Sequence, residues 1–464
     1  MPVHLTLAFR RIIYSCFILA FLIAAPLVVF YAMGYRYSFL KEKIERTGVL
    51  IVSFSPADAR LTLNGTVPDM QRDGNVAHIA NLLPGIYTIT LSADGYQPLT
   101  RIVSIAPNQS SVYKYLTLFP ENPQPVLLQQ GVFTALTMQG ETLILTSQTA
   151  TSSQIVFTDA RYNAPQRFFI PETASTTPMV IPMGYGRWSA VQFATGALYV
   201  LDRQEGRVLE LAALHTTSAV WMPDTVNPEL FALEDGYLTR YTFDQNSMPI
   251  AMDRTRTLQT LTHLQRTIYG ITLPEDTGTV ELIQWQPQQK TWEKVLDLPF
   301  SQGYAFAETA KSFLTILDTA NTILYLVTAA PTKPPELFHI SPRVDGVFWY
   351  ADGAQLLTHN EFEIAHLAFL ETFGTQAYER TILRVSTPVT NVLLHPLATH
   401  LLFAQNNSLT IASLEDQPVP DIISYAHFDS LTAFVVHPTK EALLVIGTLH
   451  GIQGLYEVPL AMKK

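Results

Sequence analysis

The longest uninterrupted hydrophobic stretch lies near the start of the chain. Residues 12–33 read IIYSCFILAFLIAAPLVVFYAM and contain no charged side chain. As a helix that rises 1.5 Å per residue, this stretch would be ~33 Å long, enough to cross a hydrocarbon layer of ~30 Å. The apolar core of a cleaved signal peptide has only ~7–15 residues, and Tyr31-Ala32-Met33 makes a poor cleavage site. The pattern predicts an uncleaved signal anchor that contacts the lipid bilayer through residues 12–33.

The charges on the two sides of this stretch give conflicting indications of its orientation. The short tail, residues 1–11, carries Arg10 and Arg11, whereas residues 34–47, the expected juxtamembrane linker, carry four Lys or Arg residues. A simple count of Lys and Arg residues would place the part of the chain after the apolar stretch in the cytoplasm. Charges just before a first helix usually dominate, however, and large following domains cross membranes largely regardless of charge. We therefore expect the C-terminal body on the extracytoplasmic side of a single-pass cell-membrane protein.

Residues 48–119 alternate between apolar and polar positions with a period of two. Runs such as GVLIVSFS and GIYTITLS are rich in β-branched and aromatic residues. Asn64-Gly65 and Asp94-Gly95 separate such runs, and both pairs adopt the positive φ angles of tight turns at low cost. The pattern predicts a small antiparallel β-sandwich. Residues 120–125, PENPQP, are predicted to form a stiff Pro-rich connector to the next domain.

Residues 126–464 repeat one pattern, in which an apolar strand ends near a Trp or His and a second apolar strand follows. It occurs around Trp221, Trp349, His395 and His437. The last three are spaced by about 42–46 residues, and the longer gap before Trp349 leaves room for two diverged copies, which we place at 266–285 and 311–327. A period of ~40–45 residues with about four strands each is typical of β-propeller blades. We therefore predict an all-β chain that ends in a propeller of seven or eight blades.

Two parts of the chain resemble known families. Ser55-Pro56, Leu83-Pro84-Gly85 with Tyr87, and Gly95-Tyr96 occur in an order similar to that of the PEGA domain. PEGA domains are typically found in envelope and surface-layer-type proteins and have no catalytic residues to carry over. The repeats resemble WD-repeat propellers, although the Gly-His and Trp-Asp signatures are absent. The order of the signal anchor, the PEGA-like segment and the propeller repeats along the chain resembles that of a family of bacterial envelope proteins of the candidate-phyla type.

Composition and charge exclude several classes of protein. Of the 464 residues, 48% are hydrophobic and 15% are charged, so the chain has the apolar residues that disordered proteins lack. The net charge of −10 argues against a partner such as nucleic acid, whose phosphates attract basic proteins. Cys16 is the one cysteine and lies in the first apolar stretch, which excludes an intramolecular disulfide and a Cys/His zinc framework.

The usual catalytic and metal-binding motifs are not found, so we expect no enzyme activity, metal or cofactor. Asp276-Thr277-Gly278 resembles half of an aspartic-protease site, but only one copy occurs and its position between two strands favours a turn. His395 and His437 share the repeat position of Trp349, which favours a structural role. An alternative is an envelope hydrolase or lyase that uses carboxylates in the propeller channel, and we single out Asp202, Asp318 and Asp352 for it.

The tryptophans are the remaining candidates for ligand contact, because propellers often bind partners through loops at one face. The candidates are Trp188, Trp221, Trp285, Trp292 and Trp349. Their period-two placement favours core packing for any single one. The sequence thus favours a membrane-anchored envelope protein with a noncatalytic binding or scaffolding platform for envelope proteins, peptidoglycan or glycans. A structural surface-layer component is a further alternative.

Overall fold

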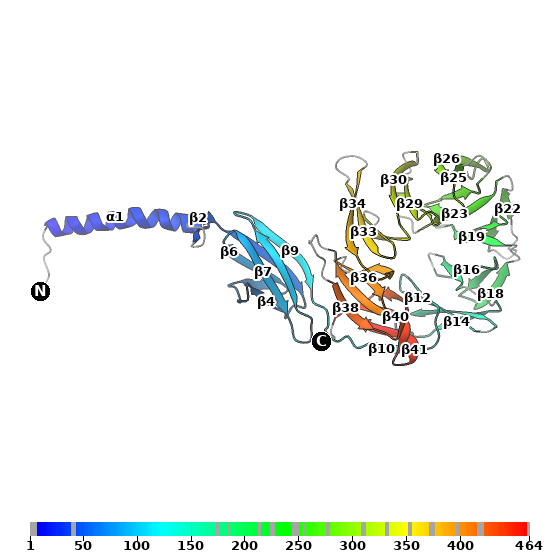
Figure 1. The fold of residues 1–464 in the computed structure, drawn as a ribbon, viewed down its shortest axis with the longest axis horizontal. Helices are drawn as coiled ribbons and strands as arrows, with labels where there is room; N and C mark the ends of the chain where they lie inside the picture. The colour runs from blue at the N-terminus through cyan, green and yellow to red at the C-terminus, as the bar shows by residue number, and fades with distance from the viewer. Residues whose placement is uncertain are drawn as a thin grey trace. The chain divides into compact units, whose positions relative to one another are not determined.

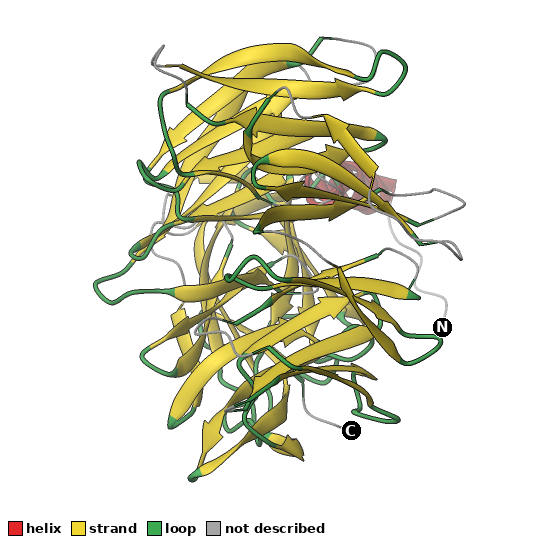
Figure 2. Ribbon diagram, turned by 90° about the vertical axis from the view of Figure 1, so that its right-hand side faces the viewer, coloured by secondary structure: helices red, strands yellow, loops and turns green. Residues whose placement is uncertain are grey.

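The computed structural model (Figure 1) describes most of the chain. The described residues are 7–38, 43–149, 151–172, 177–183, 186–211, 215–222, 228–243, 250–253, 256–274, 279–307, 312–329, 334–350, 355–370, 376–395, 399–414 and 422–461. Contacts divide the chain into two compact units, of which the second is Pro123–Pro459 and the first contains the residues before Pro123 and those after Pro459. Strands dominate both units (Figure 2), as the alternating pattern predicts.

The predicted membrane segment is a single helix, α1 (Leu7–Ala32). Its stretch Arg11–Ala32 has a mean hydropathy of 2.6, which makes it long and apolar enough to cross a membrane. Its apolar side chains, among them Phe17 and Phe21, are exposed rather than packed against protein. Immediately after it, the predicted linker contains a hairpin of β1 (Tyr35–Ser38) and β2 (Lys43–Arg46), in which Arg46 Nε donates to the Tyr35 hydroxyl at 2.7 Å.

Residues 48–119 form two sheets around one apolar core, which we call the small sandwich. One sheet contains, in order, β5 (Gln71–Asp73), β6 (Val76–Leu82), β3 (Gly48–Ser55) and β9 (Ser110–Thr117), and the other contains β4 (Arg60–Leu63), β7 (Gly85–Ser92) and β8 (Leu99–Ile105). Alternate residues of each strand, such as Leu50, Leu61 and Ile89, are buried between the sheets. Burial therefore follows the period-two pattern of the sequence.

One strand pairing of the small sandwich departs from the predicted antiparallel arrangement. Strand β3 pairs with β9 in parallel, with Val49 beside Ser110 and Ile51 beside Val112. The chain leaves β3, passes through both sheets and returns in the same direction, a connection that local alternation does not reveal. The start of β3 also lies against the β8–β9 turn. A Cβ on Gly48 would lie 2.5 Å from the Ala106 carbonyl oxygen, so only glycine fits there.

The second unit, Pro123–Pro459, is a β-propeller. Its described residues form eight four-stranded antiparallel sheets that follow one another around a ring (Figure 1). The first four sheets contain β11 (Ala135–Gln139), β12 (Thr142–Gln148), β13 (Ser153–Asp159), β14 (Gln166–Ile170); β15 (Met179–Pro182), β16 (Trp188–Gln192), β17 (Leu198–Asp202), β18 (Arg207–Leu211); β19 (Thr216–Trp221), β20 (Glu229–Glu234), β21 (Tyr237–Thr242), β22 (Ile250–Asp253); and β23 (Leu258–Leu264), β24 (Thr267–Thr272), β25 (Thr279–Gln286), β26 (Thr291–Pro299).

The other four sheets complete the ring. They contain β27 (Tyr304–Phe306), β28 (Phe313–Asp318), β29 (Ile323–Thr328), β30 (Glu336–Pro342); β31 (Gly346–Tyr350), β32 (Gln355–His359), β33 (Glu363–Leu370), β34 (Gln376–Arg384); β35 (Thr390–Leu394), β36 (His400–Gln405), β37 (Ser408–Ser413), β38 (Ile422–His427); and β39 (Ser430–Val436), β40 (Ala442–Leu449), β41 (Ile452–Pro459), with β10 (Val126–Gln130) as the fourth strand of the last sheet.

The ring is closed by strands from opposite ends of the unit. Strand β10, the first of the unit, pairs with β41, the last. The first and last sheets also share an apolar cluster, in which Leu143 and Leu145 of β12 lie with Leu444 and Ile446 of β40. Apolar clusters of the same kind join neighbouring sheets around the ring, which explains how each sheet buries both faces.

The predicted repeat is correct in its spacing but wrong in the register of two copies. Trp221 and Trp349 lie on the first strand of a sheet, and His395 and His437 directly follow one. Two further sheets occupy the gap before Trp349, as predicted. The segments 266–285 and 311–327, however, contain the second and third strands of those sheets, not the first and second. Successive antiparallel hairpins of one sheet have the same local pattern, so alternation alone does not distinguish them.

Candidate binding site

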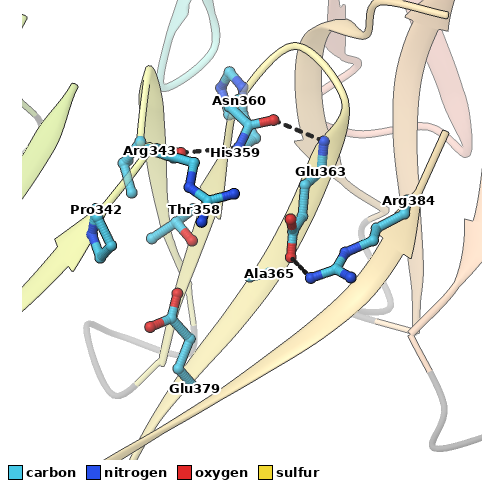
Figure 3. Close-up of a pocket in the computed structure, with 10 residues that line it drawn as sticks. Pro342, Arg343, Thr358, His359, Asn360, Glu363, Ala365, Glu379 and Arg384 are labelled. Atoms are coloured by element: carbon cyan, nitrogen blue, oxygen red, sulfur yellow. Dashed lines mark hydrogen bonds and ion pairs between the residues drawn. The ribbon is translucent and has the colours of Figure 1, made fainter. Parts of the chain in front are cut away.

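A polar cavity lies at one end of the sheet β31–β34 (Figure 3). Its walls come from the β30–β31 connection, the β32–β33 turn and the outer strand β34. The volume of the cavity is about 180 Å³, and an adjoining hollow shares four of the lining residues. The shared residues are Arg343, Asn360, Glu363 and Arg384.

The side chain of Asn360 organises the backbone of this region. Its Oδ1 accepts the backbone N–H groups of Phe362 and Glu363, each at 2.9 Å, which fixes the turn between β32 and β33. Its Nδ2 donates to the Arg343 carbonyl at 2.9 Å. Arg343 has a φ of 60°, a conformation that residues other than glycine rarely adopt. Asn360 therefore ties two connections together and holds Arg343 at the edge of the cavity.

Glu363 and Arg384 form an ion pair on one side of the cavity. The Arg384 guanidinium lies 3.2 Å from Glu363 Oε1, and the Thr381 hydroxyl donates to the same oxygen at 2.5 Å. Burial by itself raises the pKa of Glu363. The hydroxyl of Thr381 and the charges of Arg384 and Arg343 outweigh that effect and hold the pKa below its ordinary value. Glu363 is therefore ionised at neutral pH.

The Arg343 side chain has no comparable partner. It is exposed, and it makes no hydrogen bond or ion pair with any residue that the structure describes. In Figure 3 it extends into the cavity toward Thr358 and Glu363. A guanidinium presents five donors in a planar fork that matches carboxylates and similar groups. Arg343 is thus available to a ligand, whereas Arg384 already has a partner.

Glu379 lies at the other end of the cavity, away from Asn360 (Figure 3). The Ser341 hydroxyl donates to its Oε1 at 2.9 Å. The imidazole Nε2 of His339 is 3.7 Å from its Oε2, beyond ordinary hydrogen-bond distance. Glu379 is partly exposed, so its Oε2 is open to a ligand in the cavity.

His359 contributes a ring that is neutral at pH 7. Burial lowers its pKa, and the charge of Asp345 opposes this effect without overcoming it. A Cβ on Gly346 would lie 2.3 Å from His359 Nε2, so glycine at that position makes room for the ring. The described lining thus offers two guanidiniums, two carboxylates, an amide, a hydroxyl and an imidazole, a set suited to binding a polar ligand.

The tryptophans proposed as ligand contacts lie elsewhere. Trp221, Trp285, Trp292 and Trp349 are buried in apolar clusters between sheets, and Trp188 is half-buried. Trp221 Nε1 donates to the Ile181 carbonyl at 2.8 Å and Trp349 Nε1 to the Thr315 hydroxyl at 2.9 Å. These contacts agree with the core-packing interpretation. A ligand-facing role stays a prediction, and none of the five lines the cavity.

The aspartates considered for a channel site do not come together. Asp202 ends the third strand of its sheet and Asp318 ends the second strand of another, so they lie at opposite ends of their sheets. Each accepts backbone N–H groups of the turn that follows it. Asp352 and Asp276–Gly278 lie outside the described residues. Among the described residues, no group of three or more His, Cys, Asp and Glu has the geometry to hold a metal ion.

Sequence reasoning missed the cavity residues altogether. Asn360 and Glu363 belong to a turn sequence that is typical of any hairpin, and Arg343 and Arg384 are about 40 residues apart in the chain. Only the Asn side chain before a short turn is a recognisable signal, and it predicts the turn, not the site.

No protein-family model matches the chain and no curated protein matches its sequence, so the PEGA resemblance of residues 48–119 stays a prediction. Among solved structures, the β-propeller domain of Cps50 (Swd1) from Myceliophteria thermophila is 11% identical, with a TM-score of 0.46, over 73% of this chain and 99% of that one.

Two further structures are similar to the same degree. The Dos1 propeller is 10% identical with a TM-score of 0.49, over 73% of this chain and 96% of that one. Sqt1 from Saccharomyces cerevisiae is 10% identical with a TM-score of 0.47, over 74% and 98%. The propeller fold therefore rests on the sheets of this chain itself, and no function is carried over from these proteins.

Proposed function

We propose that this chain is a single-pass membrane protein of the cell envelope that presents an eight-bladed propeller as a noncatalytic binding platform. Helix α1 is long and apolar enough to be the anchor. The small sandwich, which we propose to be a PEGA domain, separates the anchor from the propeller along the chain. Each of the eight four-stranded sheets then corresponds to one blade.

The proposal places the propeller on the extracytoplasmic side. Large domains after a first helix cross the membrane largely regardless of flanking charge. The propeller contains no cysteine, and the net charge of the chain is −10, both of which suit that location. The partners that we propose are envelope proteins, peptidoglycan or glycans.

One observation carries the binding function: a polar cavity holds a guanidinium, that of Arg343, without a partner among the described residues. Most of the propeller's apolar side chains pack against one another between sheets. The cavity instead gathers polar side chains at the ends of strands, where propellers and other rigid scaffolds usually carry function. We therefore place the ligand site at this end of the sheet β31–β34.

The test is capture of envelope components on the full-length chain in detergent. The variants are Arg343→Gln and, as a matched control, Arg266→Gln, which changes an exposed arginine in the β23–β24 turn. We expect wild type and Arg266→Gln to retain the same envelope components and Arg343→Gln to lose them. Equal capture by all three would contradict the site, and no specific capture by any of them would contradict the platform.

A further inference from the structure

Four charged side chains line the cavity, and only two of them form an ion pair with each other. Glu363 and Arg384 neutralise each other at 3.2 Å. Arg343 has no ion-pair partner among the described residues, and the nearest basic nitrogen to Glu379 is the imidazole of His339 at 3.7 Å. Figure 3 shows Arg343 and Glu379 on either side of Thr358. The cavity therefore presents one available cation and one available anion to the same space.

This arrangement disfavours a ligand with a charge of one sign. With His359 neutral, the charges of Arg343, Arg384, Glu363 and Glu379 cancel. A simple anion would be attracted by Arg343 but repelled by Glu379, and a simple cation would be attracted by Glu379 but repelled by Arg343. A ligand with both charges at the right separation satisfies both groups, which is how charge patterns produce specificity.

The size of the cavity limits the ligand further. Pockets for drug-sized ligands measure roughly 300–1,000 Å³, whereas the volume of this cavity is about 180 Å³. That space suits a group of amino-acid size, and the adjoining hollow of about 420 Å³, which shares Arg343, leaves room for the rest of a short peptide. Between the two charged ends lies the buried hydroxyl of Thr358, which can pair with an amide group (Figure 3).

We propose that the cavity binds a zwitterionic amino-acid or short-peptide ligand, with its carboxylate on Arg343 and its ammonium on Glu379. A carboxylate accepts two parallel N–H bonds from a guanidinium, and the ammonium donates to Glu379 Oε2 while Ser341 keeps its bond to Oε1. The proposal deepens the binding function and rests on it, since it assigns the chemistry of the same site.

The experiment titrates the full-length chain in detergent with four forms of one peptide, by calorimetry. The forms are trialanine, which carries both charges, its N-acetylated form, its C-terminal amide, and the form blocked at both ends. We expect trialanine to bind and each single block to weaken binding by about tenfold, the effect of losing one charge-assisted interaction of ~1.4 kcal/mol.

Two variants assign the charges to residues. In Arg343→Gln, trialanine and its C-terminal amide should bind equally, because the group that recognises the carboxylate is gone. In Glu379→Gln, trialanine and its N-acetylated form should bind equally. The control Arg266→Gln should behave as wild type. Equal binding of all four forms to the wild-type chain would overturn the proposal, as would retention of both preferences in the variants.

Failure of this proposal is distinguishable from failure of the binding platform. If none of the four peptides binds while Arg343→Gln still loses captured envelope components, the site stands and the ligand class is wrong. If the peptides do not bind and no component is captured either, both proposals are overturned.

Discussion

Short polar side chains account for much of the local geometry of this molecule. Asn64 and Gly65 both have positive φ in the turn after β4, as the sequence predicts for an Asn-Gly pair. Asn360 also fixes a turn, because its side chain accepts a hydrogen bond from the backbone of that turn and donates one to the Arg343 carbonyl. The first kind of turn is predictable because it depends on neighbouring residues. The second is not, because Arg343 lies on a different connection.

At the same scale, the buried histidines make stability depend on pH. Burial lowers the pKa of His395 from 6.5 to about 4, so its ring stays neutral in the folded chain. Between these two pH values the unfolded chain binds a proton that the folded chain does not. The contribution of His395 to stability is thus present above pH 6.5 and is lost as the pH falls toward 4.

We therefore predict that His395→Gln flattens the pH dependence of stability in this window. The wild type should lose up to ~1.4 kcal/mol more per pH unit than the variant, the value for one proton. All five tryptophans lie in the propeller, so their fluorescence follows its unfolding in denaturant. His450→Gln, a change at an exposed turn, should keep the wild-type slope. Equal slopes for wild type and His395→Gln would contradict the assignment.

At the scale of elements, local periodicity identifies strands well and their partners poorly. The alternation in residues 48–119 predicts the sandwich, and the spacing of Trp349, His395 and His437 predicts the repeat. Local alternation does not predict two strand pairings, the parallel pair β3–β9 and the pair β10–β41 that closes the ring. Both join strands far apart in the chain, and local alternation carries no information about such partners.

The pairing of β10 with β41, which closes the ring, can be tested at Gly454 of β41. A Cβ at this position would lie 2.5 Å from the Gln129 carbonyl oxygen and 2.6 Å from the Leu127 side chain, so Gly454→Ala must displace strand β10. We expect a loss of about 1–3 kcal/mol, the usual cost of overpacking, and a lower unfolding temperature of the propeller by tryptophan fluorescence.

The control for this substitution is Gln453→Ala, which changes the exposed residue just before Gly454 on the same strand and leaves the close backbone contact of Gly454 unaltered. This variant should unfold at the wild-type temperature. An unchanged unfolding temperature for Gly454→Ala would show that β10 does not close the ring.

At the scale of the whole molecule, the order of parts along the chain defines the proposed function. An apolar helix, a small sandwich and a closed propeller are all expected from the sequence, because each depends on hydrophobic patterns within its own segment. The polar cavity is not, because its walls combine polar residues of two connections and of the outer strand β34. The side of the membrane is likewise not determined by the fold, since both orientations are compatible with the same helix.

Orientation is therefore the most direct test of the central claim that α1 anchors a propeller outside the cell. Cys16 is the single cysteine of the chain, so Cys16→Ser provides a background without thiols, and Gln288→Cys adds one in the exposed β25–β26 turn. A membrane-impermeant maleimide applied to intact cells should label Gln288→Cys on a membrane-bound chain that retains α1, and should not label the Cys16→Ser parent. Labelling only after the membrane is opened, or a labelled chain that has lost α1, would contradict the account.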